Sequence, residues 1–279
     1  MDADGIGLEM LSGIRQSWRV FGTGLGFLAV GVGGVFVFPV LNLVIRERQR
    51  RKVIARKLVQ LTFRGIVRSM CAFGVFQYEV KGLQRLDRQG LLILANHPTL
   101  IDIVFLMAFV PQADCIVKAR LWRNPFTRAT VRAAGYIAND DDSVRLIEDC
   151  IVSVRDSGNL IIFPEGTRTS ADGAISLKRG AANIAVRAPC NITPVRIRCA
   201  PPMLIKGEKW WRLPACSSQF SFDVMEDIDI RPFLAAAGSE VLAARQLTGY
   251  LQGFFKDERD GHASNRRRDQ AADHRCPAT

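Results

Sequence analysis

The feature that most constrains the fold of this chain is a long run without a charged residue, Val20–Ile45. A helix crosses a bilayer with ~20 apolar residues, and this run is longer. It is rich in glycine and contains Pro39, and membrane helices tolerate both residue types better than soluble helices do. A secretory signal fits less well, because no small-residue cleavage site follows. We therefore predict a transmembrane helix within an N-terminal membrane anchor, residues 1–46. The alternative is a buried helix of a soluble domain.

Basic residues follow the apolar run at once. Residues 46–52 read Arg-Glu-Arg-Gln-Arg-Arg-Lys, whereas Arg15 and Arg19 before the run are offset by acidic residues. Because cytoplasmic flanks carry the excess of Lys and Arg, this bias places the C-terminal side in the cytoplasm. Residues 47–76 then repeat apolar positions at helical spacing with basic residues between them. They predict a basic amphipathic helix at the membrane surface, or one that packs on the next domain with its charges in water.

Beyond residue 76, short apolar runs alternate with helical stretches. The predicted strands are Tyr78–Val80, Leu91–Ala95, Cys115–Val117, Tyr136–Ala138, Leu160–Phe163, Ile192–Ile197 and Phe220–Val224. The predicted helices are Pro98–Phe109, Leu121–Ala134, Ser143–Asp156, Lys178–Arg187 and Ser239–Phe255. This alternation is typical of an α/β fold with a mostly parallel central sheet flanked by helices. We predict a catalytic domain over residues 77–256 and a disordered polar tail over residues 257–279.

Charge and cysteine usage narrow the class of protein. The chain has 38 Lys and Arg against 27 Asp and Glu, a formal charge of +11. Such a surplus favours nucleic acid, an anionic bilayer, or acidic and phosphorylated substrates as partners. The seven cysteines are scattered and form no Cys-x-x-Cys pair, so they predict neither a zinc ribbon nor a disulfide framework. A reduced domain that faces the cytosol is the simpler interpretation.

Two polar motifs follow predicted strands, at the edge where an open α/β sheet places its chemistry. The first, residues 96–102, reads Asn-His-Pro-Thr-Leu-Ile-Asp. We expect a helix to start at Pro98, which leaves His97 in the turn before it. Two residues five apart on one helix point about 140° apart, but from the turn His97 can meet Asp102 in the second helical turn. The carboxylate would fix the imidazole tautomer and leave the other ring nitrogen as a general base.

The alternative for this motif is a helix-capping histidine beside an unrelated aspartate. The sequence around Asp102 is apolar, and an unpaired carboxylate in such a helix is costly. The other two histidines, His262 and His274, lie in the polar tail. We therefore predict His97 as the base and Asp102 as its partner.

The second motif, residues 163–168, reads Phe-Pro-Glu-Gly-Thr-Arg and also follows a predicted strand. Glycine lets a backbone approach a ligand closely, and arginine suits forked recognition of phosphate. Lys178 and Arg179 add positive charge at the start of the next predicted helix. Considered alone, the motif fits a ligand-binding loop and an ordinary structural turn equally well.

Together the two motifs resemble the glycerolipid acyltransferase family, the bacterial 1-acylglycerol-3-phosphate acyltransferases in particular, over roughly residues 75–230. Residues 192–197 match the family's block around a proline. The resemblance implies that His97 deprotonates the acceptor hydroxyl with Asp102 as its partner. It implies that Arg168 binds the acceptor's phosphate. The residues expected to bind the acceptor are Glu165, Gly166, Thr167 and Arg168, with Lys178 adding charge.

The chain departs from the family in the block at residues 135–140, which usually ends in an arginine that binds phosphate. Asn139 and Asp140 stand there instead, and more aspartates follow. An acidic cluster repels a phosphate. Either other basic residues fill the role, or the acceptor is a lipid without that phosphate. The basic candidates are Arg128, Arg132, Lys178 and Arg179.

The resemblance implies transfer of a fatty acyl group from acyl carrier protein or acyl-CoA to a membrane lipid hydroxyl, with 1-acyl-glycerol-3-phosphate as the first acceptor. It implies the bacterial inner membrane as location, with the catalytic domain facing the cytoplasm. Nucleic acid, a metal and a bound cofactor are not expected. The rivals are a catalytically silent lipid-binding relative and a hydrolase that gives the acyl group to water. The sequence contains no Gly-x-Ser-x-Gly elbow, which disfavours a serine hydrolase. It contains no P-loop, and no Gly-x-Gly-x-x-Gly motif follows a predicted strand, which disfavours nucleotide chemistry.

Overall fold

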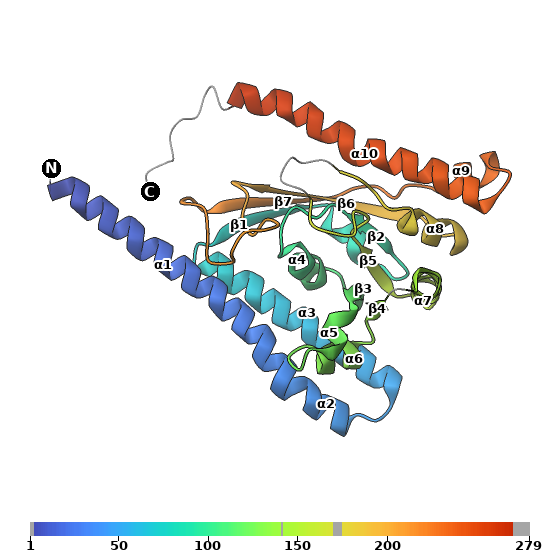
Figure 1. The fold of residues 1–279 in the computed structure, drawn as a ribbon, viewed down its shortest axis with the longest axis horizontal. Helices are drawn as coiled ribbons and strands as arrows, with labels where there is room; N and C mark the ends of the chain where they lie inside the picture. The colour runs from blue at the N-terminus through green and yellow to red at the C-terminus, as the bar shows by residue number, and fades with distance from the viewer. Residues whose placement is uncertain (1–2, 141, 170–174, 270–279) are drawn as a thin grey trace.

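The computed structural model describes residues 3–140, 142–169 and 175–269, with side chains described between residues 13 and 256. Its centre is a seven-stranded sheet (Figure 1). The strand order is β1-β7-β6-β2-β5-β3-β4, and all neighbours are parallel except β6 and β7. The strands are β1 Phe76–Lys81, β2 Leu92–Ala95, β3 Ala113–Lys118, β4 Ile137–Asn139, β5 Asn159–Ile162, β6 Ile192–Ala200 and β7 Ser218–Val224. All seven predicted strands are confirmed, as is the mostly parallel sheet.

The central strands β2 and β5 bring the two polar motifs together. Both are buried along their whole length, which explains why each appears in the sequence as a continuous apolar run. They pair in parallel, with Leu94 beside Ile162. The segments that follow them therefore leave the sheet at the same edge, although about sixty residues separate them in the chain.

Helices cover both faces of the sheet (Figure 1). One face packs against α3 (Arg48–Ala72) and α4 (Asp102–Phe109). The opposite face packs against α7 (Ser143–Arg155), α8 (Gly180–Arg187) and α10 (Glu240–Asp269). Three short helices complete the domain: α5 Ala119–Arg123, α6 Arg128–Ala134 and α9 Arg231–Ala236.

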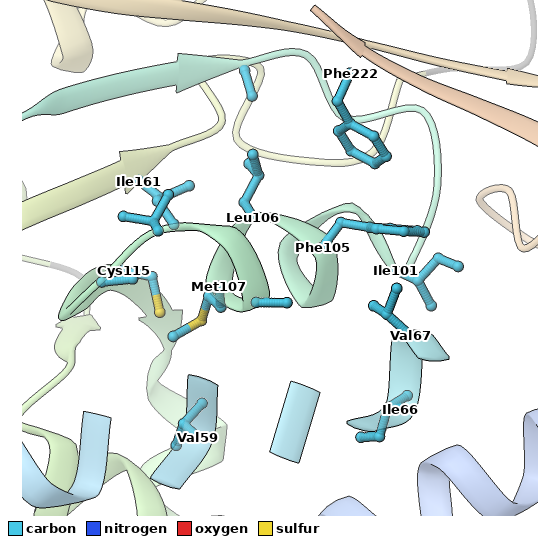
Figure 2. Close-up of a cluster of buried hydrophobic side chains, with 14 of the residues drawn as sticks. Val59, Ile66, Val67, Ile101, Phe105, Leu106, Met107, Cys115, Ile161 and Phe222 are labelled. Atoms are coloured by element: carbon cyan, nitrogen blue, oxygen red, sulfur yellow. The ribbon is translucent and has the colours of Figure 1, made fainter. Parts of the chain in front are cut away.

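The helix α4 lies between the sheet and α3 (Figure 2). Its Phe105 and Leu106 are fully buried, and Phe105 contacts the ring of Phe222 from β7 at 4.6 Å between centroids. Ile66 and Val67 of α3 are buried in the same cluster. Each such side chain contributes roughly 1.5–3 kcal/mol by burial, so α4 is held from both sides. This rigid placement matters because α4 begins at a residue of the first polar motif.

Three predicted helices begin or break at other places than expected. The helix predicted from Pro98 begins at Asp102, because Leu100 N–H donates to the carbonyl of Leu204 and thus holds the turn open. Leu121–Ala134 is interrupted before Pro125, which disfavours helical geometry in the residue that precedes it. The helix predicted from Lys178 begins at Gly180.

The helix α10 continues to Asp269 and so includes the first part of the tail predicted over residues 257–279, whose disorder stays a prediction. Extending an existing helix adds one hydrogen bond per residue without a new nucleation step, and no proline intervenes before Pro277. Residues 270–279 of the predicted tail lie outside the described residues.

Residues 47–76 contain the helix α3, one face of which is buried. Arg56 is 4% exposed, and its guanidinium donates to the carbonyls of Ala134 and Gln112 and pairs with the carboxylate of Asp114. Asp114 also accepts from the hydroxyl of Ser153 at 2.7 Å. The helix α3 thus packs on the domain, and Arg56 faces the sheet, where backbone carbonyls and a buried carboxylate accept from its guanidinium. The place of α3 at the membrane surface, which this packing does not exclude, stays a prediction.

The N-terminal segment forms α1 (Ala3–Val32), a π-helical turn η1 (Gly33–Val37) and α2 (Phe38–Val44). Within the described residues, Gly13–Val44 is long and apolar enough to cross a membrane, although a transmembrane role itself stays a prediction. One face of this helix packs on the domain, where α1 contacts α3 and α2 contacts α6. The other face presents exposed apolar side chains at helical spacing: Ile14, Trp18, Phe21, Leu25, Leu28, Val32, Phe36 and Val40. We call these residues the apolar stripe.

Candidate active site

His97 and Asp102 meet as the sequence predicts. The Nδ1 atom of His97 lies 2.9 Å from Oδ2 of Asp102. His97 occupies the turn after β2, and Asp102 is the first residue of α4 rather than a residue of its second turn. Because Nδ1 faces the carboxylate, the remaining ring nitrogen, Nε2, is the one placed to act on a substrate.

The carboxylate of Asp102 is fully buried and held by several donors. It accepts from the backbone N–H of Thr99 at 2.7 Å and from the Thr99 hydroxyl, besides its contact with His97. It also lies at the N-terminus of α4, where the helix dipole favours negative charge. Burial nevertheless raises the pKa of Asp102 above its ordinary value, against the lowering effect of the bonds from His97 and Thr99. The ionised carboxylate of Asp102 therefore lowers the stability of the fold, and such perturbed carboxylates are more typical of functional sites than of structural ones.

The imidazole of His97 also stacks on the ring of Phe163. Their centroids are 4.0 Å apart and the planes are inclined by 17°. The His97 side chain is 16% exposed, so one part of the ring reaches the surface while its face and Nδ1 are covered. Two neighbours thus restrict the imidazole to a single orientation, as a general base requires.

Glu165 links the second motif to the first. Its carboxylate is 6% exposed and accepts from the backbone N–H of His97 and from the hydroxyl of Thr169, both at 3.0 Å. The backbone N–H of Thr169 in turn donates to the carbonyl of His97 at 2.8 Å. Glu165, which the family resemblance assigns to the acceptor, is therefore directed at the turn that carries the base.

The guanidinium of Arg168 also contacts protein. Its Nη1 donates to the carbonyls of Leu204 and Ile205, at 3.0 and 2.9 Å. Arg168 thereby ties the second motif to the segment after β6. An arginine has five N–H donors, so this contact uses part of its capacity to bind an anion.

Gly166, Thr167 and Lys178 form the open side of the second motif. Gly166 has φ +69°, a left-handed conformation that costs other residues roughly 1–2 kcal/mol. A Cβ atom at Gly166 would lie 3.0 Å from the side chain of Lys178, so these two residues are in contact. Thr167 and Lys178 are exposed. A hydroxyl and an ammonium are therefore available beside the turn.

Three residues of the motifs hold the site together through contacts that the sequence analysis did not predict. Asn96 exchanges two hydrogen bonds with the backbone of Ile197 and so joins the end of β2 to β6. Thr99 holds Asp102, and Phe163 supports His97. The only signal in the sequence is their membership of the motifs, because their partners are set by tertiary contacts.

The acidic block after β4 has in part a structural explanation. Asp142 accepts from the backbone N–H groups of Val144 and Arg145 and thereby caps α7. Asp140 is exposed, and Asp141 lies outside the described residues. Of the four basic candidates, Lys178 contacts the Gly166 turn, Arg179 precedes α8, and Arg128 and Arg132 are on α6. No group of three or more His, Cys, Asp or Glu side chains suited to a metal occurs among the described residues.

Comparison with known proteins places this site in a family context. Residues 77–198 match the model of the family described as Acyltransferase. The chain is 30% identical over 131 residues to the 1-acyl-sn-glycerol-3-phosphate acyltransferase of Helicobacter pylori, covering 45% of this chain and 55% of that protein. It is 25% identical over 149 residues to the enzyme of the same name from Pseudomonas aeruginosa, covering 48% and 57%. The chain thus spans about half the length of the curated relatives it matches.

A solved structure has the same fold. The crystal structure titled 1-acyl-sn-glycerophosphate (LPA) acyltransferase, PlsC, from Thermotoga maritima superposes with a TM-score of 0.65 at 21% sequence identity. The match covers 88% of this chain and 98% of that one. At this identity the likeness is one of fold.

The raised pKa of Asp102 gives a testable stability profile. A carboxyl whose pKa is raised in the folded state contributes stability below its unfolded pKa and loses that contribution as pH rises through the folded pKa. We therefore expect Asp102→Asn to gain in Tm relative to wild type as pH rises from about 4 to about 8, even as its activity falls. Thermal unfolding across this range checks the sign. A wild type that gains stability over the variant towards alkaline pH would contradict it.

Proposed function

We propose that this chain is an O-acyltransferase of membrane lipids, because residues 77–198 match the model of the acyltransferase family. It moves a fatty acyl group from acyl carrier protein or acyl-CoA to a lipid hydroxyl, with 1-acyl-glycerol-3-phosphate as acceptor and phosphatidic acid as product. The observation that carries the proposal is the His97–Asp102 contact, 2.9 Å long, at the sheet edge where the second motif also ends.

In the proposed reaction, Nε2 of His97 removes the proton of the acceptor hydroxyl. The resulting alkoxide attacks the thioester carbonyl, and the tetrahedral intermediate collapses with release of the thiolate. The proton held by His97 then passes to the thiolate, so that ester and free thiol are formed. Asp102 keeps the Nδ1–H tautomer and stabilises the imidazolium. A general base such as His97 typically contributes 10²–10⁴ in rate. The scheme uses neither a covalent enzyme intermediate nor a cofactor.

The open side of the second motif supports a phosphorylated acceptor. The ammonium of Lys178 contacts the Gly166 turn and is exposed, so it can approach a phosphate. The relatives from Helicobacter pylori and Pseudomonas aeruginosa are named for 1-acyl-sn-glycerol-3-phosphate. The exposed Asp140 at the end of β4 favours the second candidate, an acceptor lipid without that phosphate.

We further propose that the apolar stripe inserts into the bacterial inner membrane from the cytoplasmic side. Several stripe residues are more than half exposed, including Trp18, Leu28 and Phe36. The opposite face of α1 and α2 packs on the catalytic domain, which supports insertion from one side over a helix surrounded by lipid. Such a placement brings the membrane lipid acceptor close to the domain.

The His97→Ala variant tests the reaction. We expect it to lose at least about a hundredfold in transfer, because a general base usually contributes that much. The variant should stay folded at the assay temperature, with a Tm below that of wild type because the buried Asp102 loses one donor. The assay supplies labelled acyl thioester and a panel of lysolipid acceptors with and without phosphate. His262→Ala, a histidine outside both motifs, serves as the matched control.

The same assay separates the rivals. Release of labelled fatty acid in preference to lipid product indicates a hydrolase, and no turnover with any acceptor indicates a silent lipid-binding protein. A His97→Ala variant that keeps more than about a tenth of wild-type transfer would rule out the general-base role.

Membrane binding through the apolar stripe makes a second prediction. Wild-type protein should stay with sedimenting vesicles in high salt, because burial of apolar surface is not screened by ions. The triple variant Leu25→Gln, Leu28→Gln and Val32→Gln should be released by salt to a much greater extent, since the middle of the stripe is then polar and a larger share of the remaining attraction is electrostatic. The control replaces exposed apolar residues of α10, Val241→Gln and Leu242→Gln. Equal retention of all three proteins would show that the stripe does not bind the membrane.

A further inference from the structure

A buried arginine in the apolar N-terminal helix contacts a distant segment of the chain. Arg19 is 6% exposed on α1. Its Nη1 donates to the carbonyls of Pro214 and Ala215 at 2.8 and 3.1 Å, and its Nη2 donates to the carbonyls of Cys216 and Val75 at 2.9 and 3.2 Å. Burying a guanidinium is costly unless its donors are satisfied, so this cage of carbonyls defines where α1 sits.

Three of these four carbonyls belong to the segment that joins β6 to β7, residues 201–217, which we call the connecting loop, and the fourth, that of Val75, precedes β1. Two further contacts attach its second half to α1. Gln16 donates to the carbonyl of Leu213 at 3.0 Å, and the ring of Trp210 lies 5.9 Å from that of Phe27. The second half of the connecting loop is thus fixed by the N-terminal helix.

The first half of the connecting loop is attached to the candidate active site. The carbonyl of Leu204 accepts from the backbone N–H of Leu100, in the turn between His97 and Asp102, and from Arg168. Arg168 also donates to the carbonyl of Ile205. Leu204 itself is buried and has φ +52°, which is unfavourable for a branched side chain and persists only under outside constraint.

We propose that Arg19 is a positioning residue for the acceptor site. By holding the connecting loop from α1, it sets the carbonyls that orient Arg168 and the turn at Leu100. The N-terminal helix is then part of the assembly that builds the site, besides its part in membrane binding. The kinetic consequence rests on the proposed transferase function, whereas the contact with the loop does not.

The proposal predicts which kinetic constant changes. His97 and Asp102 are held mainly by β2, α4 and Glu165, and only the Leu100 N–H between them depends on the connecting loop. The rate at saturation should therefore fall by no more than about threefold in Arg19→Met. The KM for the lipid acceptor should rise about tenfold or more, because Arg168 loses its fixed carbonyls, while the KM for the thioester donor should be unchanged. Arg19→Lys should restore the acceptor KM in part, because an ammonium cannot reproduce the fork.

Limited trypsin cleavage in vesicles reports on the loop independently of activity. The connecting loop offers cleavage after Lys206, Lys209 and Arg212, and Arg145 on α7 provides an internal reference site. In Arg19→Met we expect cleavage in the loop to accelerate several-fold relative to the reference site. Arg15→Met, an exposed arginine one turn earlier on α1, is the matched control and should behave as wild type in both assays.

Each outcome decides the proposal. Faster loop cleavage with a raised acceptor KM in Arg19→Met supports it. Unchanged cleavage overturns it. Faster cleavage also overturns it if the acceptor KM is unchanged, or if the rate at saturation, the acceptor KM and the donor KM all worsen by the same factor. A wild-type chain without transfer to any acceptor contradicts the proposed function and the kinetic arm together, and the cleavage ratio then decides the loop contact alone.

Discussion

The buried carboxylate of Asp102 is the constraint on which the arrangement of the site depends. It lies in an otherwise apolar helix, fully buried, and it stays there only because Thr99 and His97 donate to it. Those bonds fix the turn between β2 and α4, and together with the bond from the Leu100 N–H to the Leu204 carbonyl they delay the start of the helix to Asp102 itself. An unpaired charge at this position would cost several kcal/mol, so the turn, the helix start and the imidazole orientation are set together.

The parallel sheet supplies the second condition, since it brings the ends of β2 and β5 together. Glu165 then bonds the His97 backbone, and Phe163 supports the imidazole ring. The second motif thus serves first as a brace for the base. Its open residues, Thr167 and Lys178 beside the Gly166 turn, are left for the substrate. The two motifs therefore hold each other in place, and neither has to be rigid by itself.

The strands and the His97–Asp102 contact could be predicted because their causes are local. Buried parallel strands appear as continuous apolar runs, and a histidine in a turn can meet an acid five residues later. The long-range carbonyl partners of Arg19 and Arg56 could not be predicted in this way. In the sequence, Arg19 was only a flanking charge, and Arg56 belonged to a helix expected at the membrane surface or packed on the domain. Both are buried donors to backbone that is distant in the sequence. The helix start at Asp102 was missed for the same reason, since Pro98 is a sound local signal that tertiary contacts override.

The tautomer of His97 tests the central claim most directly. The chain has three histidines, and two of them lie near the C-terminus, so ¹⁵N-histidine labelling gives a spectrum that His97→Ala can assign. For the neutral form of the ring, before substrate binds, the account predicts the proton on Nδ1 and an unprotonated Nε2. Asp102→Asn should disturb this pattern, because an amide can present its N–H to Nδ1 and move the proton to Nε2. A wild-type ring protonated on Nε2, or the same tautomer in both proteins, would contradict the assignment of His97 as a base oriented by Asp102.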